Sequence, residues 1–214
     1  MTLCDIGNTS YHFINENSEF KYSVDESLNT VKLCEPIYFI SVNDKASIEF
    51  VSNFPQAKNL KEILKIDSKY ASTLGIDRAM ACSGIEDGII IDFGSAITID
   101  VMKKGSHEGG YILPGLESLK NIYPQISTKL HFDYLTNIQL DMLPTTTNEA
   151  ISYAIHLMII EPIKKLQNQY NLELIFTGEH GKYFIDYFYD ARYEPHLIFN
   201  NMKQLIQSIQ RNKK

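Results

Sequence analysis

The chain has 214 residues, of which 44% are hydrophobic, and its formal net charge is −6 at pH 7. This length can bury a substantial core, as one large domain or two small ones. The acidic balance argues against a nucleic-acid or anionic-membrane surface, because phosphate backbones are bound mainly by clustered lysine and arginine. The three cysteines have no CxxC spacing and the six histidines no paired metal-ligand spacing, so neither a disulfide framework nor a zinc site is indicated.

The sequence carries no export or membrane signal. No signal peptide precedes the first predicted strand, and the longest apolar run, Ala154–Ile160, is far too short to span a bilayer. We therefore expect a cytoplasmic protein with neither a nucleic-acid nor a membrane partner.

Hydrophobic periodicity predicts strands and helices along the whole chain. In the first part we expect strands at 1–4, 11–14, 19–24, 30–33 and 37–42, and helices at 44–51, 58–64 and from about 76 to 83. In the second part we expect strands at 88–92 and 96–101, a glycine-rich loop at 105–115, a helix at 116–126 and an irregular segment at 128–144. These are followed by a long helix from about 146 to 170, a strand at 172–176, a helix at 183–188, a strand at 195–199 and a helix at 202–209. Thr146 and Glu149 have capping-box spacing, and Pro162 is expected to kink or split the long helix.

No Pro/Ser-rich linker or low-complexity segment divides the chain. The predicted elements therefore suggest two sub-domains, 1–84 and 85–214, which pack directly and have a cleft between their hairpin tips.

An Asp-x-Gly turn joins two predicted strands twice, at Asp5–Thr9 and at Asp92–Ser95. The turn glycine has no Cβ, so backbone N–H groups can approach an anion such as phosphate closely. A carboxylate beside phosphate would repel it and would therefore hold a cation or the waters of a cation. A single copy is explained as well by the turn preference of Asp and Gly. Two strand-embedded copies are expected by chance in only about one chain in a hundred at average residue usage.

Gly75-Ile76-Asp77-Arg78 lies at the start of an Ala-rich predicted helix. In a purely structural interpretation, Asp77 is a favourable first-turn residue and Arg78 its solvated neighbour. In a chemical interpretation, the carboxylate accepts a hydroxyl proton and the guanidinium grips a carboxylate or phosphate. Sequence position alone leaves both interpretations open.

Neither a P-loop nor a His-Arg-Asp catalytic loop occurs in the sequence. Five motifs instead stand in the order seen in type III pantothenate kinases, which the chain resembles: Asp5–Thr9, Gly75–Arg78, Asp92–Asp100, Gly109–Gly115 and Thr147–Ala150. The resemblance implies the fold of the actin, hexokinase and Hsp70 superfamily. In that α/β fold, two ribonuclease-H-like sub-domains have mixed five-stranded sheets flanked by helices, and the nucleotide lies between them.

The resemblance also implies an activity and a set of site residues. ATP would phosphorylate pantothenate to 4′-phosphopantothenate in the first step of coenzyme A biosynthesis. The ATP phosphates would be bound by Asp5, Ile6, Gly7, Asn8, Thr9 and Ser95. The pantothenate site would contain Tyr70, Gly75, Ile76, Asp77, Arg78 and Thr147, with Asp77 as the catalytic proton acceptor. Asp5 would lie near Mg²⁺, and Asp92 would hold a monovalent cation, K⁺ or NH₄⁺. A homodimer is implied, with part of its interface supplied by the apolar helix 151–160.

Two positions depart from the family pattern. Ser95 replaces a commoner threonine and keeps the hydroxyl. Thr177-Gly178-Glu179 replaces the usual Thr-Gly-Gly near adenosine, so the side chain of Glu179 would weaken or reshape adenine binding.

Two other functions stay open at this level. One is a different small-molecule kinase or phosphatase on the same fold, since a fold does not specify its substrate. The other is a non-catalytic transcription accessory factor of the same family. The intact Asp5, Asp77 and Asp92 argue against that second alternative, as does the acidic composition.

Overall fold

The computed structural model describes residues 1–70 and 73–211 and divides the chain into two compact units. The first contains Met1–Gly84 and the segment from His196 that includes helix α5, Leu197–Arg211. The second contains Ile85–Pro195. The sequence had assigned everything after residue 84 to one sub-domain, whereas α5 groups with the first unit. The reason is a contact distant in sequence: the Asn201 amide donates to the carbonyls of Met80, at 2.9 Å, and Ala81, at 3.0 Å.

The first unit is built on a mixed five-stranded sheet in the order β3-β2-β1-β4-β5. Its strands are β1 Thr2–Ile6, β2 Ser10–Ile14, β3 Glu19–Ser23, β4 Ile37–Ser41 and β5 Lys58–Asn59. β1, β2 and β3 pair antiparallel, while β4 is parallel to both β1 and β5. The predicted strand at 30–33 is wrong, because these residues form a turn and an irregular segment. The predicted helix at 58–64 is also wrong: β5 is followed by the 3-10 turn η1, Leu60–Glu62, and later by the short strand β6, Asp67–Ser68.

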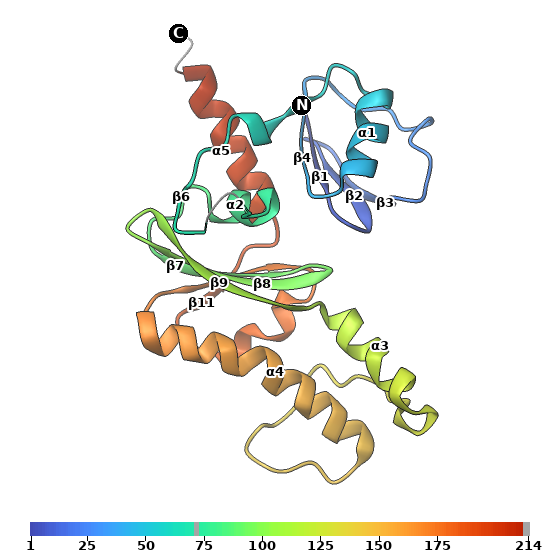
Figure 1. The fold of residues 1–214 in the computed structure, drawn as a ribbon, viewed down its shortest axis with the longest axis vertical. Coiled ribbons are helices and arrows are strands. Elements are labelled where there is room, and N and C mark those ends of the chain that lie inside the picture. Colours follow the sequence, from blue (N-terminus) through green and yellow to red (C-terminus); the bar gives the residue numbers. More distant parts are fainter. Residues whose placement is uncertain (71–72, 212–214) are drawn as a thin grey trace. The chain divides into compact units, whose positions relative to one another are not determined.

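Helices cover both faces of this sheet, as Figure 1 shows. Helix α1, Asp44–Asn53, packs its Phe50 against Cys4 and Ile6 of β1. On the other face, α2, Ile76–Cys82, and α5 pack against Leu3 of β1. The predicted strand at 195–199 is wrong, because Pro195 and His196 form a turn and Leu197–Phe199 begin α5. A short apolar run does not distinguish strand from helix, and here the helical spacing of Phe199, Met202 and Ile206 continues the buried face.

The second unit has five strands of its own, in the order β11-β10-β7-β8-β9. They are β7 Gly88–Phe93, β8 Ala96–Lys103, β9 Ser106–Pro114, β10 Leu174–Gly178 and β11 Ala191–Tyr193. Helices α3, Leu116–Ile126, and α4, Thr147–Tyr170, confirm the predicted ones. The 3-10 turn η2, Thr128–Leu130, is the one element within 128–144, and the expected helix at 183–188 is two 3-10 turns, η3 Gly181–Tyr183 and η4 Ile185–Tyr187.

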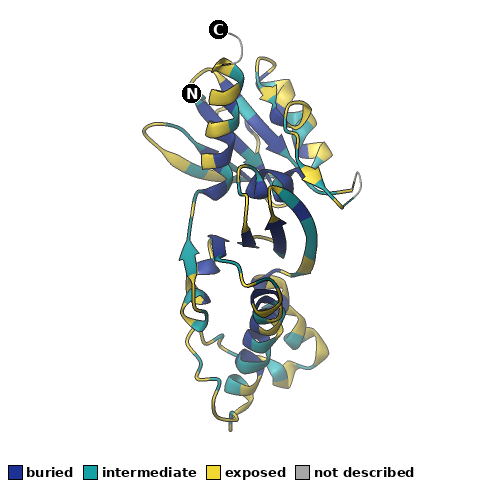
Figure 2. Cartoon of the chain, turned by 90° about the vertical axis from the view of Figure 1, so that its left-hand side faces the viewer, coloured by how far each residue is buried: buried dark blue, intermediate teal, exposed yellow. Residues whose placement is uncertain are grey.

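Helix α4 lies along one face of this sheet (Figure 1) and supplies much of its core. Figure 2 shows that buried residues, in dark blue, gather on the strands and on the inner side of the helices. Of the segment 151–160, which was expected to supply part of a subunit interface, four isoleucines are buried in this core, namely Ile151, Ile155, Ile159 and Ile160, whereas Met158 is 43% exposed. Pro162 does not split α4, because apolar residues on both sides of it, Ile160 and Ile163, hold the helix against the sheet. No helix in the described part of the chain combines the length and apolarity needed to cross a membrane.

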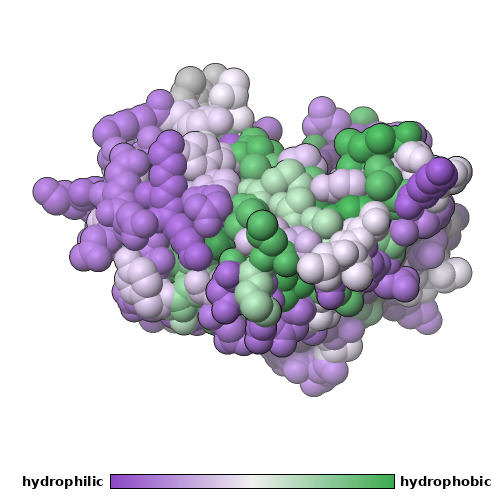
Figure 3. Space-filling model, turned by 90° about the horizontal axis from the view of Figure 1, so that it is seen from below, coloured by the Kyte–Doolittle hydropathy of each residue, from purple (hydrophilic) through white to green (hydrophobic). Residues whose placement is uncertain are grey.

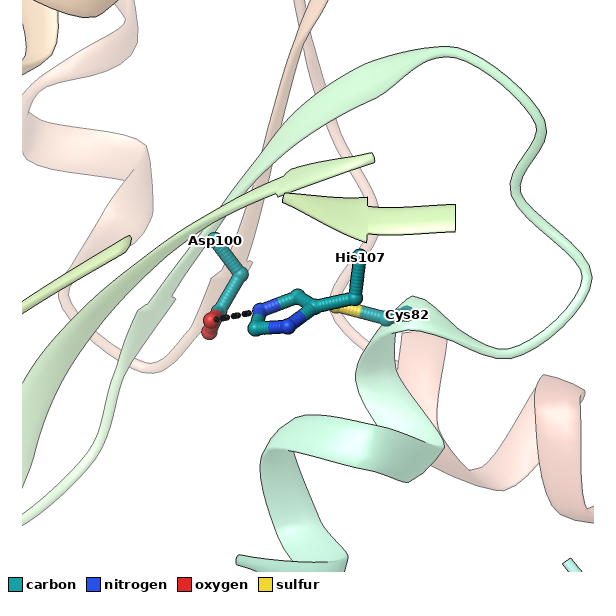
Figure 4. A group of neighbouring side chains, drawn as sticks. All are labelled: Cys82, Asp100 and His107. Carbon is teal, nitrogen blue, oxygen red and sulfur yellow. Dashed lines mark hydrogen bonds and ion pairs between the residues drawn. The ribbon is translucent and has the colours of Figure 1, made fainter. Parts of the chain in front are cut away.

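The predicted glycine-rich loop at 105–115 is largely strand β9, paired antiparallel with β8. A Cβ on Gly110 would collide with the main-chain carbonyl oxygen of Ile99, at 1.9 Å, so this glycine is needed where two strands approach closely. The register of the pair shifts between Val101 and Met102. Next to this shift the fully buried His107 imidazole lies 2.7 Å from the Asp100 carboxylate, as Figure 4 shows, and this polar pair joins the two strands.

Two of the three glycines of the β8–β9 hairpin, Gly105 and Gly110, provide a stability test. We expect Gly110→Ala to lower the free energy of unfolding by about 2–4 kcal/mol, since the strands must separate to admit the methyl group. The control is Gly105→Ala at the hairpin turn, where φ is +75° and no atom lies within 4 Å of a new Cβ. That change should cost about 1 kcal/mol, from backbone conformation alone. Urea unfolding measures both, and equal losses would contradict the close approach at Gly110.

Candidate functional site

The turn between β1 and β2 is closed and anchored by its main chain. The Gly7 N–H donates to the Ser10 carbonyl at 3.0 Å. The carbonyl of Thr9 accepts from Val24 N–H at 3.1 Å, which fixes the far side of the turn. Asn8 and Thr9 are exposed at the tip, whereas the Ile6 side chain is buried in the α1 side of the core. Ile6 can therefore offer a ligand only its main chain.

Asp5 lies on the face of the first sheet that α2 covers. Side chains alternate along a strand, so Asp5 shares its face with Leu3, while Cys4 and Ile6 point to the other side. Leu3 packs in one cluster with Ile76 and Met80 of α2. The fold thereby brings the Asp5 strand and the helix that carries Asp77 to the same side of one sheet.

Five of the six predicted pantothenate residues lie at or beside the start of α2. Gly75 is the N-cap, and a Cβ there would lie 2.5 Å from Asp77 Oδ1, so a larger residue would require this carboxylate to move. The same oxygen accepts a hydrogen bond from Arg78 N–H at 2.8 Å. Arg78 is only 5% exposed, and its guanidinium carbon lies 4.9 Å from the ring centroid of Tyr70. This cation–π geometry places Tyr70 beside the motif. Ile76, by contrast, is buried in the core.

The turn between β7 and β8 in the second unit is held from two sides. Gly94 N–H donates to the Ala96 carbonyl at 3.1 Å, and Ser95 at the tip is exposed. Gly115 N–H donates to the Ser95 carbonyl at 3.1 Å, and a Cβ on Gly115 would lie 2.4 Å from that oxygen. On the other side, Gly178 has φ +77°, and its Cβ would lie 2.5 Å from the Phe93 carbonyl. Both glycines therefore let neighbouring main chain close on the tip.

Asp92 stands between two threonines in the sheet of the second unit. Its register partners are Thr98 on β8 and Thr177 on β10. Directly opposed residues share a face of the sheet, and this face is the one opposite Ile91 and Phe93, which point into the core. A carboxylate with two neighbouring hydroxyls is the kind of oxygen-rich donor set that hard cations prefer.

Thr147 is the exposed first residue of α4. The predicted cap is present in a modified form: Thr146 Oγ1 accepts from Glu149 N–H at 3.2 Å, and Glu149 Oε2 accepts from the N–H of Thr145, one residue before the N-cap, at 3.3 Å. Thr147 belongs to the second unit, whereas Tyr70 and Asp77 belong to the first. Thr147 is thus the one predicted pantothenate residue that belongs to the second unit.

Sequence analysis missed two residues that support the hairpin turns. The amide of Asn43, the N-cap of α1, lies 3.4 Å from the Asn8 carbonyl. The Tyr193 hydroxyl donates to the Gly178 carbonyl at 2.9 Å, and burial together with the negative charge of Glu179 raises the pKa of Tyr193, which keeps it a donor. The N-cap preference of asparagine could have indicated the first. No local pattern indicates the second, because the contact requires the pairing of β10 with β11.

Comparison with known proteins identifies relatives over the whole chain. A family model described as type III pantothenate kinase matches residues 42–169. A type III pantothenate kinase of Helicobacter hepaticus is 39% identical, over 97% of this chain and 98% of the relative. A crystal structure from Campylobacter jejuni, described as a conserved candidate Baf family transcriptional activator, is 36% identical with a TM-score of 0.85, over 99% of this chain and 100% of that one.

A more distant structure supports the fold alone. MreB 5 of Spiroplasma citri is 9% identical with a TM-score of 0.53, over 99% of this chain and 97% of that one. The architecture is therefore that of the actin-like ATPases, as predicted. With the family model covering more than half of the residues and a full-length relative at 39% identity, the chain belongs to the type III pantothenate kinase family.

Proposed function

We propose that this protein transfers the γ-phosphoryl group of ATP to the hydroxyl oxygen of pantothenate, yielding 4′-phosphopantothenate and ADP, the first step of coenzyme A biosynthesis. One observation carries this proposal: Asp5 and helix α2, which bears Asp77, lie on the same side of the first sheet. The chain that has this arrangement matches pantothenate kinases along its whole length. Phosphoryl transfer requires positioned phosphates, cations that offset their charge and a base near the acceptor hydroxyl. Residues suited to each task are present.

The predicted ATP and pantothenate residues receive a role in this proposal, except Ile76, whose side chain is buried in the core. The main chain of Asp5–Thr9 and of Ser95 binds phosphate oxygens, and Asp5 lies near the Mg²⁺ that accompanies ATP. Asp77 accepts the proton of the pantothenate hydroxyl as its oxygen attacks phosphorus. Tyr70, Gly75 and Arg78 shape the pantothenate site, in which the buried Arg78 guanidinium supports the Tyr70 ring. Thr147 contributes a further pantothenate contact.

Two substitutions at neighbouring positions should separate catalysis from binding. Asp77→Asn keeps the size and removes the proton acceptor, so kcat should fall by roughly two to four orders of magnitude while ATP binding persists. Arg78→Lys keeps the charge but loses the planar group that lies against Tyr70, so KM for pantothenate should rise, by about tenfold. The measurement is pantothenate-dependent ATP consumption by the purified protein.

The pair also tests the overall assignment. A kcat of Asp77→Asn within a few-fold of the unsubstituted protein would show that Asp77 only orients the hydroxyl. ATP consumption that does not depend on pantothenate would reject the proposed substrate, and a panel of other small alcohols would then identify a different kinase on this fold.

We further propose that Asp92 binds a monovalent cation that activity requires. Asp92 adds a carboxylate to the negative charge of the ATP phosphates, and Mg²⁺ prefers small octahedral sites in which it keeps several waters. A larger ion at Asp92 would offset the remaining charge, and the neighbouring Thr98 and Thr177 suit such an ion. The sequence contains no P-loop lysine that could take this role.

Salt substitution tests the cation. We expect high rates in potassium and ammonium salts and low rates in sodium and choline salts at matched ionic strength. In Asp92→Asn the difference between potassium and choline should disappear, because the ion loses its charged ligand. Equal rates in all four salts for the unsubstituted protein would refute the requirement.

The similar Campylobacter jejuni structure is described as a transcriptional activator, so a second candidate function is accessory action in transcription. The catalytic set argues for the kinase, since Asp5, Asp77 and Asp92 are all present. Pantothenate-dependent ATP consumption distinguishes the two, because a non-catalytic factor would consume none.

We also propose a homodimer. Several large apolar side chains of the second unit are exposed: Ile112, Ile122, Ile126, Met142 and Leu143. Figure 3 shows a surface on which apolar side chains, in green, form an area bordered by hydrophilic ones. Exposed apolar groupings of this kind often mark protein interfaces. Because four isoleucines of 151–160 are buried, we propose that Ile122 and Ile126, one turn apart on α3, contribute to the interface in addition to that segment, in which Met158 is exposed.

Sedimentation measures this association. We expect a dimer for the unsubstituted protein and at least a tenfold weaker dimer for Ile126→Glu, whose charge would be buried on association. Glu161→Gln, at an exposed position of α4, serves as a control for general surface effects. A fully active monomer at all concentrations would contradict the homodimer.

A further inference from the structure

Three loops of the second unit converge at the end of β7. The tip at Asp92–Ser95 is contacted by the main chain of Gly115 on one side and of Gly178 on the other. Beyond these contacts, His180 Nε2 lies 3.8 Å from Glu117 Oε1, so the loop after β10 also meets the first turn of α3. The residue between Gly178 and His180 is therefore held beside the tip.

That residue is Glu179, which is exposed and whose neighbours in the chain are held in place by their contacts. The Gly178 carbonyl before it is fixed by the Tyr193 hydroxyl. Gly181 after it is buried, and a Cβ there would touch the Tyr193 ring at 3.3 Å and Phe93 at 3.6 Å. Under this loop the rings of Phe93 and Phe176 stack at 6.1 Å. The backbone on both sides of Glu179 is thus fixed by packing, although its side chain faces solvent.

The charge of Glu179 limits what it can recognise. A carboxylate accepts hydrogen bonds and repels phosphate, so its partner must be a part of the ligand that donates. Adjacent strands lie about 4.8 Å apart, which puts the residues after β10 one strand away from the phosphate-facing tip on β7. In a nucleotide the group directly joined to the phosphates is the sugar, and its two neighbouring hydroxyls are donors. The base is farther away.

We propose that Glu179 accepts hydrogen bonds from the ribose hydroxyls of the bound nucleotide and so selects ribonucleotides. This inference rests on the proposed kinase function, which makes the ATP phosphates the ligand of the β7–β8 tip. Charge-assisted hydrogen bonds to two vicinal hydroxyls are among the stronger neutral-ligand contacts a carboxylate makes. Losing one typically weakens binding by roughly tenfold.

Calorimetric titration with ADP, 2′-deoxy-ADP and 3′-deoxy-ADP tests this directly. The unsubstituted protein should bind ADP about tenfold more tightly than at least one deoxy analogue. In Glu179→Ala the three affinities should become equal within about twofold, and Glu179→Gln should give an intermediate preference. The control is Glu86→Gln, an exposed carboxylate just before the opposite end of β7, which should keep the preference of the unsubstituted protein.

Equal affinities for the three nucleotides in the unsubstituted protein would overturn the inference, and so would an unchanged ribose preference in Glu179→Ala. A change in the preference for ADP over GDP, with ribose preference intact, would also overturn it and assign Glu179 to the base. The proposed function is tested separately by pantothenate phosphorylation in the unsubstituted protein. Ribose selection that depends on Glu179 supports the inference even if another acceptor replaces pantothenate.

Discussion

The pleat of strand β1 is the constraint on which the first unit depends. Successive side chains point to opposite faces, so Cys4 and Ile6 enter the core under α1 while Leu3 and Asp5 face α2. Continuous registers with β2 on one side and β4 on the other hold this alternation. A slip by one residue would send Asp5 into the apolar core and Ile6 towards the helix that carries Asp77. The relation between the two carboxylates therefore depends on the burial of their apolar neighbours.

In the second unit, the important constraint is the packing that holds an exposed turn in one conformation. The tip after β7 is fixed by main chain that only glycine allows to come so near, at Gly115 and at Gly178. Catalysis of phosphoryl transfer consists largely of positioning and of offsetting charge, so a turn that is rigid before the ligand arrives loses little entropy on binding. The same close packing also brings the α3 start and the loop after β10 to the tip. The position of Glu179 beside the tip results from these contacts.

Elements with strong local signals were predicted correctly from the sequence. The two Asp-x-Gly hairpins, α3 and the capped start of α4 agree with the structure. The failures share one cause, which is that tertiary contacts overrode a short local pattern. Gly109 and Gly110 suggested a loop but permit a close strand pair, and the apolar run before Met202 suggested a strand but extends α5. Pro162 was expected to interrupt α4, yet core packing on both sides keeps the helix whole.

The sequence by itself determined the chemistry-bearing residue types, their order and the local elements that carry them, because capping, turn formation and hydrophobic periodicity act over a few residues. Only the tertiary structure decided which of them are neighbours. Tyr70 lies against Arg78, Asp92 stands between Thr98 and Thr177, and α5 groups with the first unit. Each of these relations joins residues through sheet register or side-chain packing. Such contacts depend on the free energy of the whole fold, and a local pattern does not specify the partner that a distant segment will supply.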